Sequence, residues 1–100
     1  MERQITLREI IVLIKSLKEE IRTAYRAEVV GIFGSFVRGE ADETSDIDVL
    51  VRFDKDADLF DFVGLSIFLE ERLGRKVDVV PRDTVRPELK EIILKEAVSV

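Results

Sequence analysis

An apolar stripe at helical spacing runs through the first quarter of the chain. Its members recur mostly three or four residues apart: Leu7, Ile10, Ile11, Ile14, Leu17, Ile21 and Ala24. This spacing predicts an amphipathic helix from Thr6 to about Arg26. Thr6 followed by Glu9 matches a capping box, so we expect the helix to begin there.

Shorter patterns predict strands and turns after this helix. Residues 28–33 are a β-branched and aromatic run, typical of a buried strand, that ends at Gly34. Residues 35–38 can form one helical turn closed by Gly39, and residues 40–45 are polar and predict a loop.

Residues 47–53 alternate in a way that assigns each side chain to one face of a second strand. One face carries Ile47, Val49, Val51 and Phe53, and the other carries Asp46, Asp48, Leu50 and Arg52. Side chains two residues apart project from the same side of a strand. The aspartates therefore lie opposite the apolar face.

The last third of the chain predicts helix, strand and helix. Asp58 can cap a helix over residues 59–73, with Gly74 suited to its end. Residues 76–80 form a third strand, on which Asp78 lies opposite Val77 and Val79. A final helix runs from Pro87 to about residue 97. We expect residues 1–100 to form a single α+β domain, with helices packed on one sheet face and three aspartates on the other.

Composition narrows the available chemistry. The chain has no cysteine and no histidine, which excludes thiolate nucleophiles, zinc sites built on these residues and Ser-His triads. Carboxylates remain, and carboxylates favour hard cations such as Mg²⁺. The net charge of −5 argues against direct binding of a nucleic-acid backbone.

No apolar run reaches the ~20 residues of a membrane span. Charges among the first apolar residues do not fit a signal peptide, so we expect a cytoplasmic protein without a membrane segment. The absence of Asn and Cys, with abundant Lys, Arg and Glu, indicates a thermophilic source.

The strongest candidate for chemistry is the group of aspartates on the polar face. Asp46 and Asp48 project from the same side of one strand, roughly 6–7 Å apart along the backbone. Their repulsion is relieved by a divalent cation, and pairs of Mg²⁺ ions serve nucleotidyl transfer. Asp78 can supply a third carboxylate. The plainer interpretation is a solvated polar strand face. For the aspartates at 54, 56, 58 and 61, solvation and helix capping are a sufficient explanation.

Gly34 and Ser35 add a candidate anion site. A strand that ends in Gly-Ser and continues into a helical turn presents backbone N–H groups and a hydroxyl to a phosphate. Taken alone this pair is also a common turn. Arg38 has two interpretations, since it can neutralise phosphate or pair with Glu40 or Asp42.

In combination, these motifs closely resemble the signature of the minimal nucleotidyltransferase (MNT) family of the DNA polymerase beta superfamily. That signature is Gly-Ser, ten residues, then Asp-x-Asp, matched here by Gly34, Ser35, Asp46 and Asp48. The Arg38-Gly39 pair also matches, residues 76–80 resemble the third-carboxylate strand, and the resemblance spans roughly residues 28–98. Phe36 and Val37 depart from the small or polar residues common after Gly-Ser.

The resemblance implies a nucleotidyltransferase fold with a small mixed sheet of three or four strands. It implies two Mg²⁺ ions on Asp46, Asp48 and Asp78, with Asp78 also the base, and ATP as substrate. Gly34 and Ser35 would hold the β- and γ-phosphates, with Arg38 as an auxiliary. The chain ends after this core, an arrangement similar to MNT antitoxins encoded beside a helical HEPN ribonuclease toxin. The expected reaction is therefore transfer of AMP to a protein hydroxyl, a tyrosine of the HEPN partner.

Two other functions stay open at this point. The chain could be an antitoxin that neutralises its partner by binding alone, with a vestigial nucleotide site. It could also modify a small cationic molecule of the aminoglycoside kind, which an acidic protein would attract. The nucleotide base, the acceptor and the oligomeric state are not determined by the sequence, and an oligomer is possible.

Overall fold

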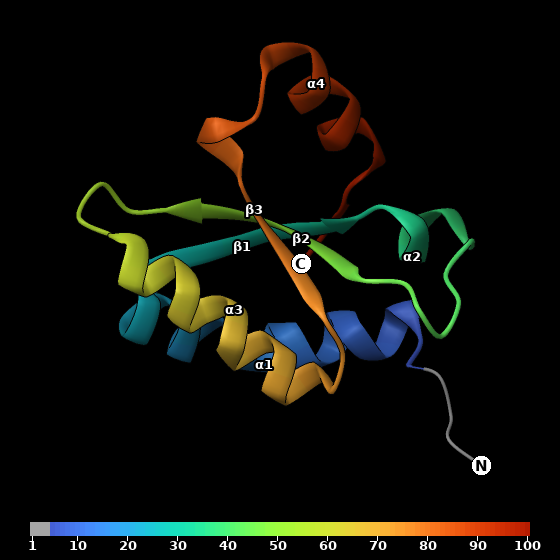
Figure 1. Cartoon of the computed structure of the whole chain (residues 1–100), viewed down its shortest axis with the longest axis horizontal. Coiled ribbons are helices and arrows are strands. Elements are labelled where there is room, and N and C mark those ends of the chain that lie inside the picture. Colours follow the sequence, from blue (N-terminus) through green and yellow to red (C-terminus); the bar gives the residue numbers. More distant parts are fainter. Residues whose placement is uncertain (1–4) are drawn as a thin grey trace.

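The computed structural model describes residues 5–100, and its elements follow the predicted order (Figure 1). The helices are α1 (Leu7–Tyr25), α2 (Ser35–Arg38), α3 (Leu59–Leu73) and α4 (Pro87–Glu96), with a short 3₁₀ helix η1 (Arg82–Thr84). The strands are β1 (Ala27–Phe33), β2 (Ile47–Phe53), β3 (Val77–Pro81) and β4 (Val98–Ser99). Within the described range the sequence prediction missed η1 and β4, because three and two residues are too few to carry a periodic pattern.

Two helices begin with the reciprocal caps that their sequences indicate. The Thr6 hydroxyl accepts a hydrogen bond from the Glu9 backbone N–H, and the Glu9 carboxylate accepts one from the Thr6 N–H, both at 3.1 Å. Asp58 and Asp61 repeat this arrangement at the start of α3, both at 3.0 Å. Of the four aspartates at 54, 56, 58 and 61, the last two are therefore explained by helix capping, as predicted.

The four strands form one mixed sheet in the order β3-β2-β1-β4. β1 is antiparallel to both β2 and β4, whereas β2 and β3 are parallel. The parallel pair is joined through α3, which packs on the sheet as a crossover helix. This order puts β2, the strand with the Asp-x-Asp motif, in the interior of the sheet with β1 and β3 on either side.

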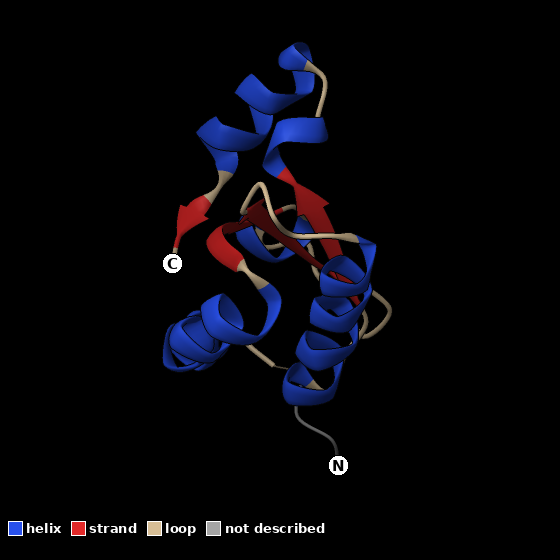
Figure 2. Cartoon of the chain, turned by 90° about the vertical axis from the view of Figure 1, so that its left-hand side faces the viewer, coloured by secondary structure: helices blue, strands red, loops and turns tan. Residues whose placement is uncertain are grey.

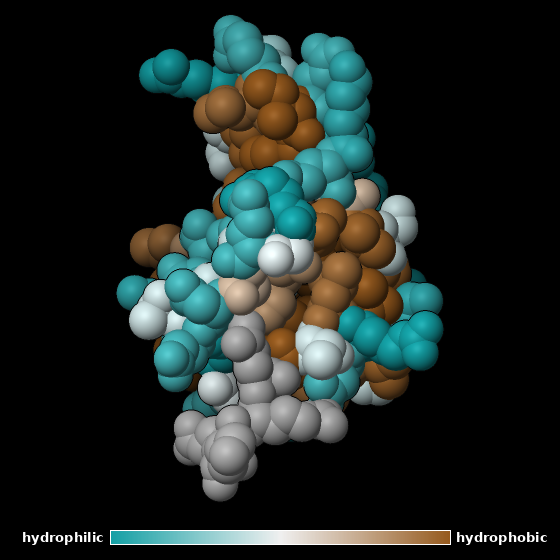
Figure 3. Space-filling view, turned by 90° about the vertical axis from the view of Figure 1, so that its right-hand side faces the viewer, coloured by the Kyte–Doolittle hydropathy of each residue, from teal (hydrophilic) through white to brown (hydrophobic). Residues whose placement is uncertain are grey.

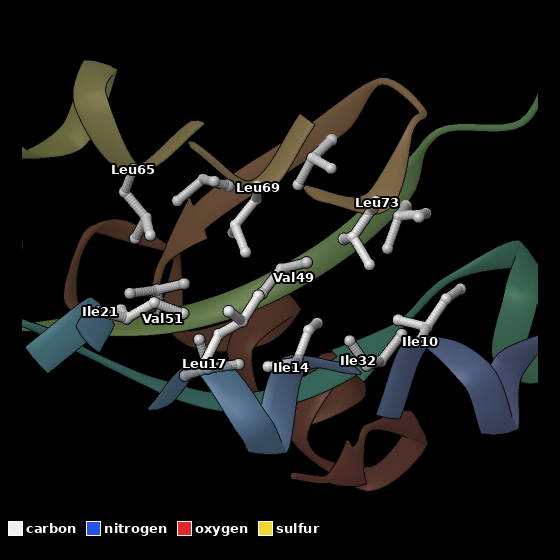
Figure 4. Packing of buried hydrophobic residues seen from close by; sticks show 14 of the residues in the cluster. Ile10, Ile14, Leu17, Ile21, Ile32, Val49, Val51, Leu65, Leu69 and Leu73 are labelled. Atoms are coloured by element: carbon white, nitrogen blue, oxygen red, sulfur yellow. The ribbon is translucent and has the colours of Figure 1, made fainter. Parts of the chain in front are cut away.

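α1 and α3 cover one face of the sheet, as predicted, and the core lies between these helices and the strands (Figures 2 and 4). The fully buried residues of this layer include Ile10, Ile14 and Ile21 of α1, Val49 and Val51 of β2, and Leu65 and Leu69 of α3. At roughly 1.5–3 kcal/mol for each buried aliphatic side chain, this layer dominates the stability of the fold. It also leaves the opposite face of β2 and β3 available for polar chemistry.

The opposite side of the sheet is bordered by η1 and α4, which stand beyond it in both views (Figures 1 and 2). α4 has no buried residue, but β4 anchors its end by pairing with Gly31 and Ile32. A Cβ on Gly31 would lie 2.6 Å from the Val98 carbonyl oxygen, so glycine is what lets β4 approach β1 this closely. None of the helices in residues 5–100 has the length and apolar character to cross a membrane.

Candidate active site

Strand register brings the separated motifs of the sequence together. In the β1–β2 pair, Phe33 lies opposite Asp48, so the Gly34-Ser35 turn follows directly beside the Asp-x-Asp motif. In the parallel β2–β3 pair, Asp48 lies opposite Asp78. Side chains of paired residues point to the same face, so these two carboxylates are neighbours. Three parts of the predicted site therefore meet at one end of the sheet.

Gly34 is in van der Waals contact with the Asp48 carboxylate. A Cβ at this position would lie 1.9 Å from Asp48 Oδ2, and the φ of +83° belongs to the region that side chains rarely adopt. Any other residue would displace Asp48 and strain the turn. Glycine is therefore required here on two independent grounds.

The turn that follows Gly34 is held by its own backbone. The Gly34 carbonyl accepts hydrogen bonds from the N–H groups of Val37 and Arg38, at 3.0 and 3.1 Å. The Ser35 carbonyl accepts from Gly39 and, at 2.9 Å, from Glu40. Within residues 5–100 the Ser35 hydroxyl has no hydrogen-bond partner. The hydroxyl is therefore left available to a ligand, on a turn of fixed shape.

Asp48 carries the electrostatic signature of the site. Partial burial, followed by the charges of Asp78, Asp46 and Glu96, raises the pKa of its carboxyl from 3.8 to about 6, against an opposing effect of Arg38. Burial and like charges both disfavour the ionised form. The three predicted aspartates are therefore close enough to repel one another, with Asp48 at their centre.

These residues fit a divalent cation by charge and by ligand type. Oxygen ligands and accumulated negative charge are what Mg²⁺ prefers, and a cation would reverse the repulsion at Asp48. In the described part of the chain, no three acidic side chains lie close enough together to enclose a metal ion. Metal binding would therefore require the exposed side chains of Asp46 and Asp78 to rotate toward Asp48.

Arg38 pairs with two carboxylates. Its Nε donates to Glu40 at 2.6 Å, as one interpretation of the sequence anticipated, and its Nη1 donates to Glu96 at 2.8 Å. Asp42, the other anticipated partner, is engaged elsewhere. Sequence reasoning missed Glu96, because a glutamate in the last turn of a surface helix gives no signal of a contact with residues about sixty positions earlier.

The loop before Asp46 is ordered by its own polar side chains. Asp42 accepts hydrogen bonds from the Thr44 N–H, the Thr44 hydroxyl and the Ser45 hydroxyl. These bonds lower the pKa of the Asp42 carboxyl, and the bond from the Thr44 hydroxyl contributes most. The Ile47 N–H then donates to the Lys76 carbonyl at 3.0 Å and starts β2. Asp46 is therefore fixed between a locked turn and the first bond of the sheet.

An open cavity of about 700 Å³ borders the site. It is lined by Ile5, the loop of residues 41–46 and residues 73–76. Of the predicted site residues it reaches Asp46 alone, so the cavity adjoins the aspartate group without containing it.

Fold and site together define a nucleotidyltransferase. The chain matches the family model of the nucleotidyltransferase domain over residues 14–100 and belongs to that family.

Individual relatives agree with this assignment. The protein adenylyltransferase MntA of Thermococcus cleftensis is 38% identical over 96 residues, which cover 96% of this chain and 97% of that protein. A protein of Methanocaldococcus jannaschii, provisionally named a protein adenylyltransferase, is 52% identical over 69 residues, covering 69% and 74% of the two chains. A solved structure provisionally described as a minimal nucleotidyltransferase superposes with a TM-score of 0.78 at 33% identity, covering 99% of this chain and 100% of that one. The family and fold predicted from the sequence are confirmed.

Proposed function

We propose that this chain transfers AMP from ATP to a hydroxyl group of a partner protein. The observation that carries the proposal is the contact of the Gly34 turn with Asp48, which itself lies opposite Asp78. The proposed phosphate site and the proposed cation site would thus share one boundary. Nucleotidyl transfer needs this adjacency, because the phosphates that are gripped and the phosphorus that is attacked belong to one ligand.

Each predicted residue has a role in this reaction. Gly34 and Ser35 would bind the β- and γ-phosphates, with Arg38 as an auxiliary cation. Asp46, Asp48 and Asp78 would hold two Mg²⁺ ions, which when bound would offset the negative charge that develops on the phosphates. Asp78 would accept the proton of the incoming hydroxyl group while the oxygen of that hydroxyl bonds to the α-phosphorus. The bond from the α-phosphorus to the bridging oxygen breaks, and pyrophosphate leaves.

The acceptor is proposed from the relatives and from the family resemblance. A relative that aligns over nearly the full length of both chains is named a protein adenylyltransferase. We take the acceptor to be a tyrosine of a helical HEPN ribonuclease, with this chain acting as its antitoxin in the cytoplasm. A solved structure described as a toxin–antitoxin with AMP-PNP superposes on this chain with a TM-score of 0.66 at 20% identity. The match covers 81% of this chain and 67% of that one. At this identity it supports the fold alone.

The test is to incubate the chain with the protein encoded beside it, ATP and Mg²⁺, and to measure the intact mass of both. The proposal expects one or more added AMP groups on the partner with wild type, and none with Asp46→Asn or Asp78→Asn. Asp56→Asn serves as the matched control, since Asp56 is exposed in the loop before α3 and lies outside the site. A partner that stays unmodified, yet is inhibited equally by wild type and Asp46→Asn, would favour an antitoxin that works by binding alone.

A further inference from the structure

Glu96, the last residue of α4, reaches the first glycine of the nucleotidyltransferase signature. Its Oε2 accepts a hydrogen bond from the Gly34 N–H at 2.9 Å, and its Oε1 accepts one from Arg38 Nη1 at 2.8 Å. Arg38 and Gly34 lower the pKa of the Glu96 carboxyl, in that order. The Glu96 side chain is 23% exposed; its bond to the Gly34 N–H is partly buried, whereas its bond to Arg38 is exposed. One ionised carboxylate thus bridges the two ends of the turn predicted to bind phosphate.

This bridge fixes the direction of the Arg38 guanidinium. Glu40 holds its Nε and Glu96 holds one terminal nitrogen, so two carboxylates grip the group from two sides. An arginine has five N–H donors, and the remaining ones stay available to a phosphate. A free arginine side chain loses about 2 kcal/mol of rotamer entropy when it is ordered. Here that ordering precedes ligand binding.

The C-terminal segment holds Glu96 itself in place. β4 follows Glu96 almost at once and pairs with β1 at Gly31 and Ile32. Beyond it, the Val100 N–H donates to the Val30 carbonyl at 3.3 Å, and Lys18 Nζ donates to the Val100 carbonyl oxygen at 2.8 Å. The segment is therefore tied to β1 on one side and to α1 on the other. A carboxylate on such an anchor is suited to orient a neighbour.

We propose that Glu96 is a positioning residue for the triphosphate of the nucleotide. This role rests on the proposed function, because it concerns the same phosphate site. Glu96 acts through Arg38, which it orients; its bond to the Gly34 N–H holds the carboxylate in place, so that N–H is not the donor offered to phosphate. Apolar side chains gather at the top of Figure 3, where α4 itself exposes Leu89, Ile92 and Leu94.

The experiment measures the affinity for ATP and for AMP by calorimetry with Mg²⁺. Glu96→Gln keeps the size of the side chain and removes its charge. We expect it to weaken ATP binding roughly tenfold, the loss of about 1.4 kcal/mol typical of a charge-assisted hydrogen bond. AMP, which has no β- or γ-phosphate, should bind wild type and Glu96→Gln equally. In an Arg38→Gln background the Glu96→Gln change should have little further effect, because the two residues act as one unit.

Two further variants complete the design. Glu91→Gln removes the same charge from α4 and breaks an exposed pair with Lys95, so it should leave ATP affinity unchanged. Glu96→Asp retains the charge but is one methylene too short to reach both donors, and it should also weaken ATP binding. It carries the test if Glu96→Gln fails to fold.

The outcomes separate this role from its rivals. Tighter ATP binding by Glu96→Gln would show a carboxylate that competes with phosphate and would overturn the proposal. Equal ATP affinity, with a lower melting temperature, would reduce Glu96 to a structural tie and would also overturn it. In both cases the wild type binds ATP and the proposed function stands. A wild type that binds no ATP with Mg²⁺ contradicts the proposed function itself, and this role with it.

Discussion

Replacing Asp48 by Asn should stabilise the metal-free protein at neutral pH. The Asp48 carboxyl has its pKa raised from 3.8 to about 6 by burial and by the neighbouring carboxylates. At about 1.4 kcal/mol per pKa unit, this rise corresponds to about 3 kcal/mol. Asp48 is only half-buried, so solvent screening lowers the expected gain to about 1–2 kcal/mol. Asn has nearly the same shape, and the Asp48 side chain accepts no hydrogen bond from residues 5–100 that Asn would lose.

The sign of the pH dependence follows from the raised pKa. Between pH 3.8 and about 6 the unfolded chain has released the Asp48 proton while the folded chain still holds it. Folded protein therefore binds more protons in this window, and the contribution of Asp48 to stability falls as pH rises. Below the window Asp48 is protonated in both states and costs nothing. Above it the full cost applies.

The assay is urea unfolding in EDTA at a series of pH values, for wild type, Asp48→Asn and the exposed control Asp56→Asn. The wild-type curve alone is not diagnostic, because the lowered pKa values of Asp42 and Glu96 act in the opposite direction, with stability lost as pH falls. The difference between Asp48→Asn and wild type isolates Asp48. It should be near zero at about pH 3.5 and reach about 1–2 kcal/mol at about pH 7.5. A difference independent of pH, or a loss of stability at neutral pH, would refute the account of Asp48.

Two further predictions address the metal and the glycine. Mg²⁺ at about ten times its Kd should stabilise the wild type by about 1.4 kcal/mol, and Asp46→Asn should blunt this response; equal shifts in both proteins by differential scanning fluorimetry would count against a shared site. Gly34→Ala should destabilise the fold by at least about 2 kcal/mol, because its Cβ would meet Asp48 in addition to the strain of a positive φ. Gly74→Ala, with φ +66° and open space around its Cβ, should cost only about 1 kcal/mol in the same denaturant titration. Similar losses in the two variants would contradict the tight contact at Gly34.

The sequence predicted the fold well because its patterns are long and mutually consistent. α1 has a capping box and an apolar stripe along its length, and β2 alternates except at Leu50, which is buried although it was assigned to the face of the aspartates. β4 could not be predicted, since two residues have no period and its pairing depends on the space left by Gly31.

The candidate site residues could be named from the sequence where their motif is local, and their roles stay predictions. Gly34, Ser35, Asp46 and Asp48 belong to one continuous motif, and Asp78 was recognised from a strand whose register with β2 only the structure provides. The ion pairs of Arg38 were half-predicted. Glu40 is two residues away and was anticipated, whereas Glu96 depends on where α4 ends in space. Long-range polar contacts of this kind leave no mark on the local sequence.

The central claim is that this site moves AMP and not phosphate. The most direct measurement is to supply ATP radiolabelled at either the α-phosphorus or the γ-phosphorus, with Mg²⁺ and the partner protein, and to follow the label on a denaturing gel. Nucleotidyl transfer predicts that the α-label becomes attached to the partner, and that the γ-label is released as pyrophosphate. Asp48→Asn should abolish the attachment. Attachment of the γ-label, or of neither label while Mg²⁺ and ATP are bound, would contradict the account.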